Sequence, residues 1–489
     1  MNAPPAPSTT TLRRGGVLAP GLGASLVVAN TSSVSAILPW IATDLHIDRT
    51  HTQWLFASYA ITLAAALLPA GALADRHGHR RVFLAGLAAF AVLALAAATS
   101  THPTELLLVR AAQGLAGAVL TTSSLGLLRH HLPGHDQTRA FALWGATIGA
   151  GAAIGPLLSG WLTEHHSWRW AMAAPAPACA AVMLIALTRH APIPGHHSTV
   201  DQRQTARVAI VLVTAAFAVV DGPLHGWWQP HDTPQLLGRP WPLPIAPAAL
   251  AAAAALVLVL RRPRRTPSAL RPNTGFRTAN LIAGVIALGE FGLLAVIPGW
   301  IRETFHASPT QVTAAPTALS VGVLIAGALA SRTRSHAPLR WVRAGLGIEI
   351  ATMGAFALAA LSPSTWWTPT AWLGLYGLGV GLAGAQLTHI ALREIPREQS
   401  GVAAATHNAV RQIGTAAGIT LVVAAYIALA GSREGPTSVL PSSSSAISAT
   451  AALVAAILLV GLTLTFLLHP DPRGPRGPNR PTADRRTHE

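Results

Sequence analysis

A glutamate stands in the middle of a long apolar stretch, where a carboxyl group is unusual. Glu290 lies in IALGEFGLL, thirteen positions after Arg277 and twelve before Arg302. At 1.5 Å per helical residue it is roughly 20 Å from either arginine, near the midplane of a bilayer. Desolvation there favours the neutral acid, which suits a proton that is bound and released near neutral pH. The alternative is a permanent ion pair with Arg110 or Arg411, which would keep the acid charged.

Three more charged residues lie inside apolar stretches, where an ionisable group is costly unless it is paired or hydrated. Arg411 is deep in its stretch and needs a partner, for which Glu290 is the first candidate. Arg110 lies near one end of its stretch, and it either shapes the local electric field or is a solvated end residue. Glu349 follows Arg343 by six positions, about 9 Å along a helix. We therefore expect Glu349 to reach the surface or a loop, ahead of a role in a cavity.

Membrane-spanning helices must position these side chains. The chain has 489 residues, of which 51% are hydrophobic and 11% charged, and this is far more apolar than a soluble protein of that size requires. Segments of about twenty apolar residues are long enough to cross the hydrocarbon core. We predict fourteen spans, near 17–41, 53–74, 82–100, 105–128, 139–162, 168–188, 206–224, 242–260, 279–301, 311–331, 341–361, 367–391, 401–430 and 447–468.

The span at 206–224 is the weakest of the fourteen. Arg207 and Asp221 bracket only thirteen residues, so this span needs Trp227 and Trp228 as an interfacial anchor. If it or the span at 242–260 were missing alone, basic runs further along the chain would turn to the outer side. The two spans are therefore present or absent together.

The distribution of arginine sets the expected orientation. All 34 basic residues are arginine. With the N-terminus in the cytoplasm, the arginines outside the spans gather on the inner side, as the positive-inside rule requires. The exceptions on the outer side are Arg49, Arg169, Arg239, Arg302 and Arg433. We expect a multi-pass protein of the cytoplasmic membrane with both termini in the cytoplasm.

The composition excludes several classes of protein. Without lysine the chain has no Walker A loop and no Schiff-base nucleophile. No nucleophile, metal-ligand set or cofactor motif appears, so we expect neither an enzyme nor a bound metal or cofactor. A net charge of +16 would suggest nucleic acid as partner of a soluble protein, but here the arginines border apolar spans and indicate contact with anionic lipid. Cys179 is the single cysteine and forms no internal disulfide.

A repeated phrase divides the chain into halves. GALADRHGHRR begins at Gly71 after the second span, and GALASRTRS begins at Gly327 after the tenth, a shift of eight spans. Two six-span bundles separated by two extra spans explain that shift. The expected division is a tail at 1–16, a bundle at 17–190, two extra spans with a basic linker at 191–275, a second bundle at 276–468 and a disordered tail at 469–489.

Five motifs resemble those of the major facilitator superfamily, and specifically its fourteen-span drug:proton antiporters. The phrase at Gly71 looks like the loop motif between spans two and three, and LLLVRAAQGLAGA (106–118) is similar to the fourth-span motif. GAAIGPLLSG (151–160) resembles the fifth-span antiporter motif, SWRW (167–170) the start of span six, and HNAVRQIGTAAG (407–418) the thirteenth-span pattern. The resemblance covers nearly the whole chain. It implies an all-α membrane protein with the major facilitator fold, in which two six-helix bundles rock around a central cavity beside two extra helices.

The resemblance also implies roles for residues of the first and fourth spans. Arg110 and Gln113 belong to the fourth-span motif, and Arg110 is expected to face the helix that carries Asn30. The family usually has an aspartate at this position, nine residues before a proline, which here is Pro39. Because asparagine cannot release a proton, any role of that acid is carried elsewhere or lost.

Conformational change is expected to involve the loop motif. In the family's motif the acid acts as a latch, so Asp75 should accept hydrogen bonds from a helix N-terminus or an arginine, while Gly78 permits the tight turn. A solvated junction is the alternative. The second half has Ser331 where Asp75 stands in the first, so only one half carries the charged latch. The arginines expected at the inner surface are Arg76, Arg80 and Arg81.

The fifth span carries the string GxxxGPxxxG. Small residues spaced by four let helices approach closely, and a proline permits a bend, so this string favours a hinge at the bundle interface. Ordinary helix packing fits the glycines as well. The residues concerned are Gly151, Gly155, Pro156 and Gly160.

The leading hypothesis is proton-coupled export of lipophilic small molecules, drugs or antibiotics, by alternating access. Its partners would be the substrate, protons and membrane lipids, without nucleic acid, and we expect a monomer. The alternatives are a uniporter or importer, an exporter of one metabolite, and a membrane sensor that keeps the fold without transport. The absence of an aspartate at Asn30 weakens the case for cationic drugs in particular.

Overall fold

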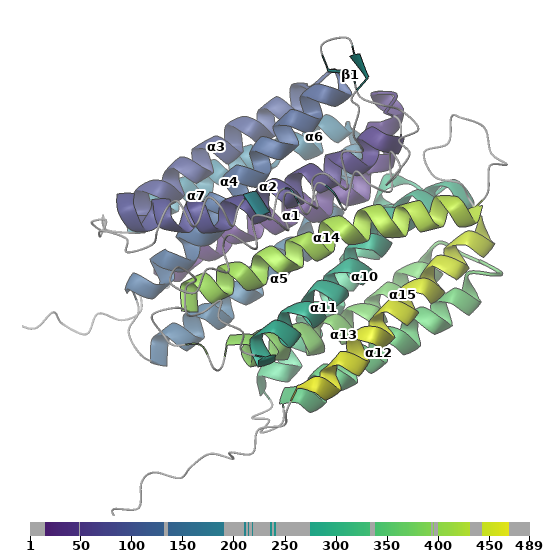
Figure 1. Cartoon of the computed structure of the whole chain (residues 1–489). Coiled ribbons are helices and arrows are strands. Elements are labelled where there is room, and N and C mark those ends of the chain that lie inside the picture. Colours follow the sequence, from purple (N-terminus) through teal and green to yellow (C-terminus); the bar gives the residue numbers. More distant parts are fainter. Residues whose placement is uncertain are drawn as a thin grey trace, which may run out of the picture.

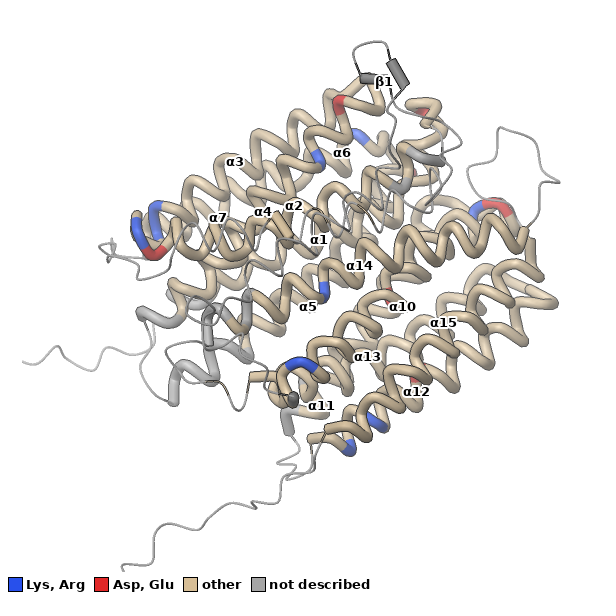
Figure 2. The backbone as a smooth tube through the Cα atoms, in the orientation of Figure 1, with Lys and Arg blue, Asp and Glu red and all other residues tan. Residues whose placement is uncertain are grey.

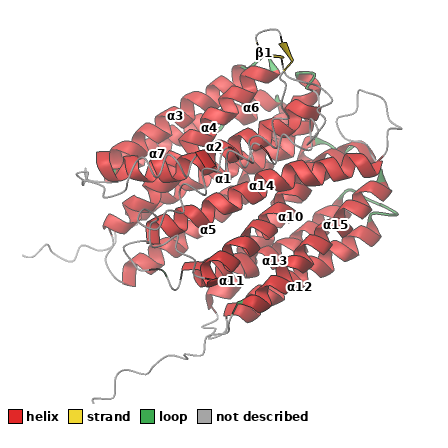
Figure 3. Cartoon of the chain, viewed as in Figure 1, coloured by secondary structure: helices red, strands yellow, loops and turns green. Residues whose placement is uncertain are grey.

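The protein is almost entirely helical (Figure 3). The computed structural model describes residues 15–47, 49–131, 135–189, 274–332, 338–392, 400–430 and 443–468, together with the isolated positions 210, 211, 214, 218, 235, 236, 239, 240 and 395. Within these ranges, twelve segments are long and apolar enough to cross a membrane. The single described hairpin pairs β1 (Gln235–Leu236) with β2 (Arg239–Pro240) and lies apart from the helices in Figure 1.

The first group of helices corresponds to the first six predicted spans. The sixth span is broken into α6 and α7 at Ala174, because Pro175 has no backbone N–H to continue the helical hydrogen bonds. The members are α1 (Gly15–Asp44), α2 (Arg49–His77), α3 (His79–Thr99), α4 (Pro103–His131), α5 (His135–His165), α6 (Trp168–Ala173) and α7 (Pro175–Arg189).

The second group corresponds to the last six predicted spans, and its final helix continues into a short 3-10 turn, η3 (Thr465–Leu467). The members are α10 (Thr274–Phe305), α11 (Pro309–Arg332), α12 (Pro338–Ala359), α13 (Trp367–Leu392), α14 (Ser400–Ala430) and α15 (Ser444–Leu464). Twelve of the fourteen predicted spans are thus confirmed as helices. The predicted span at 242–260 lies outside the described residues, and of 206–224 only positions 210, 211, 214 and 218 are described, all helical.

The two groups repeat the same packing. In the first group α1 packs on α5 and α2 on α4, and in the second α10 packs on α14 and α11 on α13. Between the groups, α5 packs on α11 and α2 on α14. Figure 1 shows the purple and blue helices of the first group beside the green and yellow helices of the second. This is the two-fold arrangement that the repeated phrase predicts.

The helices have two distinct ends, which we name by residues. At the Asp44 end α1 stops, and Asp44 accepts a hydrogen bond from Trp168 at the start of α6. At the Gly78 end α2 turns into α3 through Gly78, whose φ of 90° favours glycine. Figure 2 shows the charged residues mainly near the helix ends, with the middle of the helices mostly uncharged. This pattern suits segments whose middle lies in hydrocarbon.

The connection between the groups starts and finishes at the same end. Arg80, at the start of α3, donates to Leu187 O near the end of α7, so α7 stops at the Gly78 end. Arg302, in the last turn of α10, donates to Pro39 O and to Thr43 near the end of α1, so α10 starts at the Gly78 end. The described helices are therefore compatible with two spans, or none, in between.

Candidate functional site

A cavity of about 160 Å³ lies between the two helix groups. Its walls come from α1, α2, α4 and α5 on one side and from α10, α11 and α14 on the other. Most of the lining is apolar or hydroxylated, and its polar members include Thr31, Ser32, Glu290, Asn408 and Gln412. A central cavity between bundles, which the sequence resemblance implied, is therefore present in this structure.

Glu290 is the acidic residue that lines this cavity. Its side chain is only 8% exposed, and its Oε2 atom has no hydrogen-bond partner. Among the described residues, no cation lies within ion-pair distance of its carboxyl group, although the charge of Arg411 acts on it from α14. Glu290 thus faces a hollow between the groups rather than lipid, and it is not held in a closed ion pair.

The internal repeat relates Glu290 to the first helix. Gly151 and Gly155 of α5 pack against Ser25 and Ala29 of α1, and Gly414 and Gly418 of α14 pack in the same way against Gly284 and Leu288 of α10. The sequence offset that relates the α1 residues of these contacts to the α10 residues also aligns Pro39 with Pro298 and Thr31 with Glu290. Both Thr31 and Glu290 line the cavity. The acid therefore occupies, in the second half, the position next to the counterpart of Asn30.

Glu349 lies close behind Glu290, inside the second group. Its side chain is fully buried at 0% exposure, and neither carboxyl oxygen has a hydrogen-bond partner. The expectation that this acid reaches the surface or a loop is wrong, because α12 starts at Pro338 and places Glu349 near its middle. Instead Glu349 packs over Gly379 of α13, and it interacts electrostatically with Glu290. It does not line the cavity.

Two further polar groups near these acids were not predicted from the sequence. Tyr376 of α13 is fully buried, its hydroxyl has no partner, and its electrostatic neighbours are Glu349 and Glu290. His407 of α14 is also buried, and its ring nitrogens contact Asn280 of α10 at 3.0 Å and Thr388 of α13 at 3.2 Å. Only the packing of distant helices brings these groups together.

Arg411 is half-buried on α14. It acts electrostatically on Glu290 and on His407. It is not among the residues that line the cavity. Arg411 therefore supplies positive charge to the second group without closing an ion pair across the cavity.

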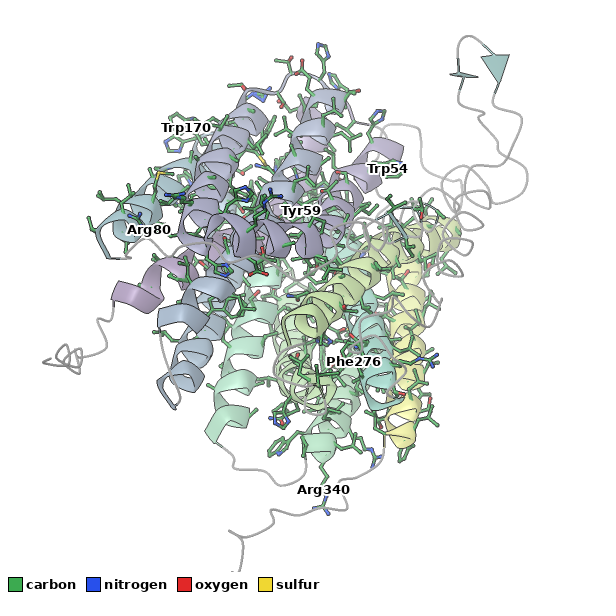
Figure 4. All side chains as sticks on the ribbon, turned by 60° about the vertical axis from the view of Figure 1, so that its left-hand side comes forward. Trp54, Tyr59, Arg80, Trp170, Phe276 and Arg340 are labelled. Atoms are coloured by element: carbon green, nitrogen blue, oxygen red, sulfur yellow. The ribbon has the colours of Figure 1, made fainter. Side chains whose placement is uncertain are left out.

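Arg110 is at the centre of a separate cluster in the first group. Its side chain is 1% exposed, so it is not a solvated end residue. One guanidinium nitrogen donates to Asn30 Oδ1 and to Gln113 Oε1, and the guanidinium carbon lies 4.3 Å from the centre of the Tyr59 ring. Figure 4 shows Tyr59 inside this helix group. Among the described residues no carboxylate contacts Arg110, whose Nε and second terminal nitrogen lack partners.

Asn30 connects this cluster to a second cavity of about 290 Å³. That cavity lies within the first group, between α1, α5, α6 and α7, and most of its lining is apolar. Gly151 and Gly155 also line it. Asn30 therefore does not face the central cavity, and neither Arg110 nor Gln113 lines either one.

We predict that the residue at position 30 controls the stability of the first group. Asn30→Ala should lower the melting temperature in lipid, because a hydrogen bond to a charged group contributes about 1.5–3 kcal/mol. Asn30→Asp should raise it by giving Arg110 an anionic partner. The single cysteine, Cys179, is buried, so a thiol-reactive dye reports unfolding. Ser33→Ala, on the same helix, is the control, and an aspartate variant that melts no higher than the alanine variant contradicts the prediction.

The glycines of the fifth predicted span serve two interfaces. An added Cβ at Gly151 would lie 2.7 Å from Ser25 O, and one at Gly155 would lie 2.7 Å from Ala29 O, so both glycines allow α5 to touch the backbone of α1. Gly160 instead faces Thr313 of α11, in the other group. Pro156 lies within α5, which continues through it. The GxxxGPxxxG string therefore provides close packing within the first group and also a contact with the second group.

Asp75 pairs with a histidine at the Gly78 end. Its Oδ1 atom lies 3.3 Å from Nε2 of His79, the first residue of α3, and its side chain is 47% exposed. The partner is thus neither an arginine nor a helix N-terminus. Arg80 binds the end of α7, whereas no contact of the Arg76 or Arg81 side chains adds to the pairing of Asp75 among the described residues.

Hydrogen bonds join the two groups near the Asp44 end. There Glu164 of α5 accepts hydrogen bonds of 2.9 Å from Ser308 Oγ and from Thr310 N at the start of α11. Arg302 of α10 binds Pro39 O and Thr43 of α1. Nearer the middle of the helices, Thr317 and Ser320 of α11 donate hydrogen bonds to Ala153 O and Ala152 O of α5. The central cavity is therefore closed off from the Asp44 end.

Two matched groups of helices long enough to span a membrane, with a cavity between them, are typical of a membrane transporter. The family model of the Major Facilitator Superfamily matches residues 21–419, and the chain belongs to that family. It is a multi-pass membrane transporter and not an enzyme. The prediction of the superfamily is confirmed, and membership of its fourteen-span drug:proton antiporters stays a prediction.

Relatives of the chain include antibiotic resistance proteins. It is 29% identical over 451 residues to the puromycin resistance protein pur8 of Streptomyces alboniger, which covers 84% of this chain and 83% of that protein. It is 27% identical over 418 residues to the tetracenomycin C resistance and export protein of Streptomyces glaucescens, with coverages of 83% and 74%. A structure solved in work on proton dependent oligopeptide transporters has the same fold, with a TM-score of 0.65 at 12% identity over 93% of this chain and 98% of that one.

Proposed function

We propose that this protein exports lipophilic small molecules, including antibiotics, in exchange for protons, and that it belongs to the fourteen-span drug:proton antiporters. The observation that carries the proposal is Glu290, a buried carboxyl group on the wall of the central cavity that has no ion-pair partner among the described residues. Because this acid can bind and release a proton at the cavity wall, its proton occupancy can be coupled to substrate occupancy. The names of the relatives favour antibiotics as the substrate class.

The arginine distribution supports a cytoplasmic Gly78 end, with both termini inside. In that orientation, the hydrogen bonds that close the Asp44 end separate the cavity from the outer side. Substrate enters from the cytoplasm or the inner leaflet and is released after the groups rock about the cavity. The described lining of the central cavity combines apolar side chains with hydroxyl and amide groups and a single acid, Glu290. Such a lining suits neutral or weakly basic lipophilic molecules.

An efflux screen tests the proposal. Host cells lacking their own exporters are compared with and without the gene for survival on puromycin and on tetracenomycin C, and for retention of each compound. Expression should lower retention, and a protonophore should abolish the difference. Retention that rises on expression indicates an importer, and loss of the compound that persists with the protonophore indicates a uniporter. Unchanged retention across a broad antibiotic panel would refute drug export.

We predict that Asp75→Asn slows turnover more than it weakens substrate binding. The carboxylate ties α2 to His79 across the turn at the Gly78 end, so its loss should disturb the interconversion of the two states. The maximal efflux rate in vesicles should fall several-fold, with the concentration for half-maximal rate nearly unchanged. Glu105→Gln is the control, because Glu105 is an acid at the other end of the same group. An unchanged maximal rate would refute the latch.

A further inference from the structure

The acid on the cavity wall is not alone. Behind Glu290, the hydroxyl of Tyr376 and both carboxyl oxygens of Glu349 are buried without hydrogen-bond partners, and so is Oε2 of Glu290 itself. The three side chains come from α10, α13 and α12, and they interact electrostatically with one another. An added Cβ at Gly289 would lie 3.4 Å from the Tyr376 hydroxyl, which therefore points at the turn of α10 that carries Glu290.

The positive charge near this cluster balances only one carboxylate. Arg411 of α14 acts on Glu290, whereas no cation lies within ion-pair distance of Glu349 among the described residues. His407 lies one turn before Arg411 and is held by Asn280 and Thr388. Helix α15, which also packs on α10 and α12, has no titratable residue, and those of α1 and α11 are at helix ends. Two buried, desolvated carboxylates with only one arginine near them would be high in energy. One of the two carboxyl groups therefore retains a proton.

We propose that Glu290, Tyr376 and Glu349 form a proton relay, in which Glu349 holds a reserve proton that reaches the cavity only through Glu290. The reason is access, because Glu290 lines the cavity and Glu349, at 0% exposure, does not. The role of this relay in transport rests on the proposed function. The presence of the relay does not.

The transfer step conserves protons and charge. Once Glu290 has released its proton into the cavity, its carboxylate takes the hydroxyl proton of Tyr376, and the phenol oxygen takes the proton of Glu349. One O–H bond breaks and one forms at Tyr376, so the tyrosine ends unchanged. The negative charge moves from Glu290 to Glu349, and Glu290 is neutral again. No oxidant, reductant or further reactant takes part.

Infrared spectroscopy of the purified protein in lipid tests the relay without any substrate. At neutral pH the wild type should show a carbonyl-stretch band of protonated carboxylic acid, and Glu349→Gln should remove it. Glu303→Gln is the matched control, because Glu303 is a half-exposed acid at the end of the same helix as Glu290, and this variant should leave the band intact. Thermal unfolding verifies that each variant is folded.

Hydrogen–deuterium exchange of the same band distinguishes a relay from a structural acid. In Glu290→Gln and in Tyr376→Phe the Glu349 band should persist and exchange at least several-fold more slowly, and in Tyr376→Phe it should also shift in frequency. A missing band in the wild type, a band that survives Glu349→Gln, or exchange rates that neither variant changes would each overturn the proposal. Loss of the band when sodium replaces choline at constant pH would assign the site to a metal cation and overturn it too. Because no transport is measured, failure of the export hypothesis leaves these results interpretable.

Discussion

Glu290→Gln is expected to abolish export driven by a pH gradient. The substitution keeps the size and most of the polarity of the side chain but removes its ability to bind and release a proton at the cavity wall. In inverted membrane vesicles with an imposed pH gradient, accumulation of an antibiotic substrate should fall to the level seen without the gradient. The amount of folded protein in the membrane should stay the same, since glutamine matches glutamate in size and keeps a polar group at the cavity wall.

The control for this prediction separates coupling from binding. Without a gradient, Glu290→Gln vesicles should still equilibrate the substrate down its concentration gradient, because the cavity and its apolar lining are intact. Glu303→Gln, outside the cavity, should behave as the wild type. Gradient-driven accumulation that is undiminished in Glu290→Gln would remove this acid from the mechanism.

A disulfide across the α5–α11 contact is expected to stop transport completely. An added Cβ at Gly160 would lie 2.9 Å from the Cβ of Thr313, and the Cβ atoms of a disulfide are about 3.8 Å apart, so a small shift allows the bond. The pair joins the two groups near the Asp44 end. If the groups must separate there to release substrate, the oxidised pair holds the protein in the state described above.

The experiment uses Gly160→Cys with Thr313→Cys in a Cys179→Ala background. Export from vesicles should vanish on oxidation and return on reduction, and the same vesicles thus serve as their own reference. The Cys179→Ala background should not respond to the oxidant. A cross-linked protein that continues to export would show that the Asp44 end does not need to open at this contact.

The sequence predicted the helices well because length and apolarity alone determine them. The twelve confirmed spans each lie within a few residues of the observed helices, and the repeat of Gly71 at Gly327 correctly indicated two matched groups. The break between α6 and α7 was missed, although Pro175 carried a signal for it. The predicted pair at 206–224 and 242–260 stays a prediction.

The site was predicted in part. The depth of Glu290 followed from its distance to flanking arginines, and the structure places it at a cavity, but its role stays a prediction. The depth of Glu349 was underestimated because Arg343 was taken as the membrane boundary, whereas Arg343 is a helix residue that binds Thr465. Tyr376 and His407 could not be found from sequence, since their neighbours come from helices far apart in the chain. The pairing of Asp75 with His79 could have been predicted, because His79 follows Asp75 by four positions across Gly78.

Helix α5 touches α1 through Gly151 and Gly155 and touches the other group through Gly160. If the Asp44 end faces outward, as proposed above, a molecule that arrives from outside the cell meets this second contact closed, with Glu164 hydrogen-bonded to Thr310 at the start of α11. An antibody fragment or cyclic peptide raised against that surface meets no open channel that it could block. It would inhibit by holding Glu164 and Thr310 together, so inhibitors should be sought as binders of this closed face rather than as mimics of a transported molecule.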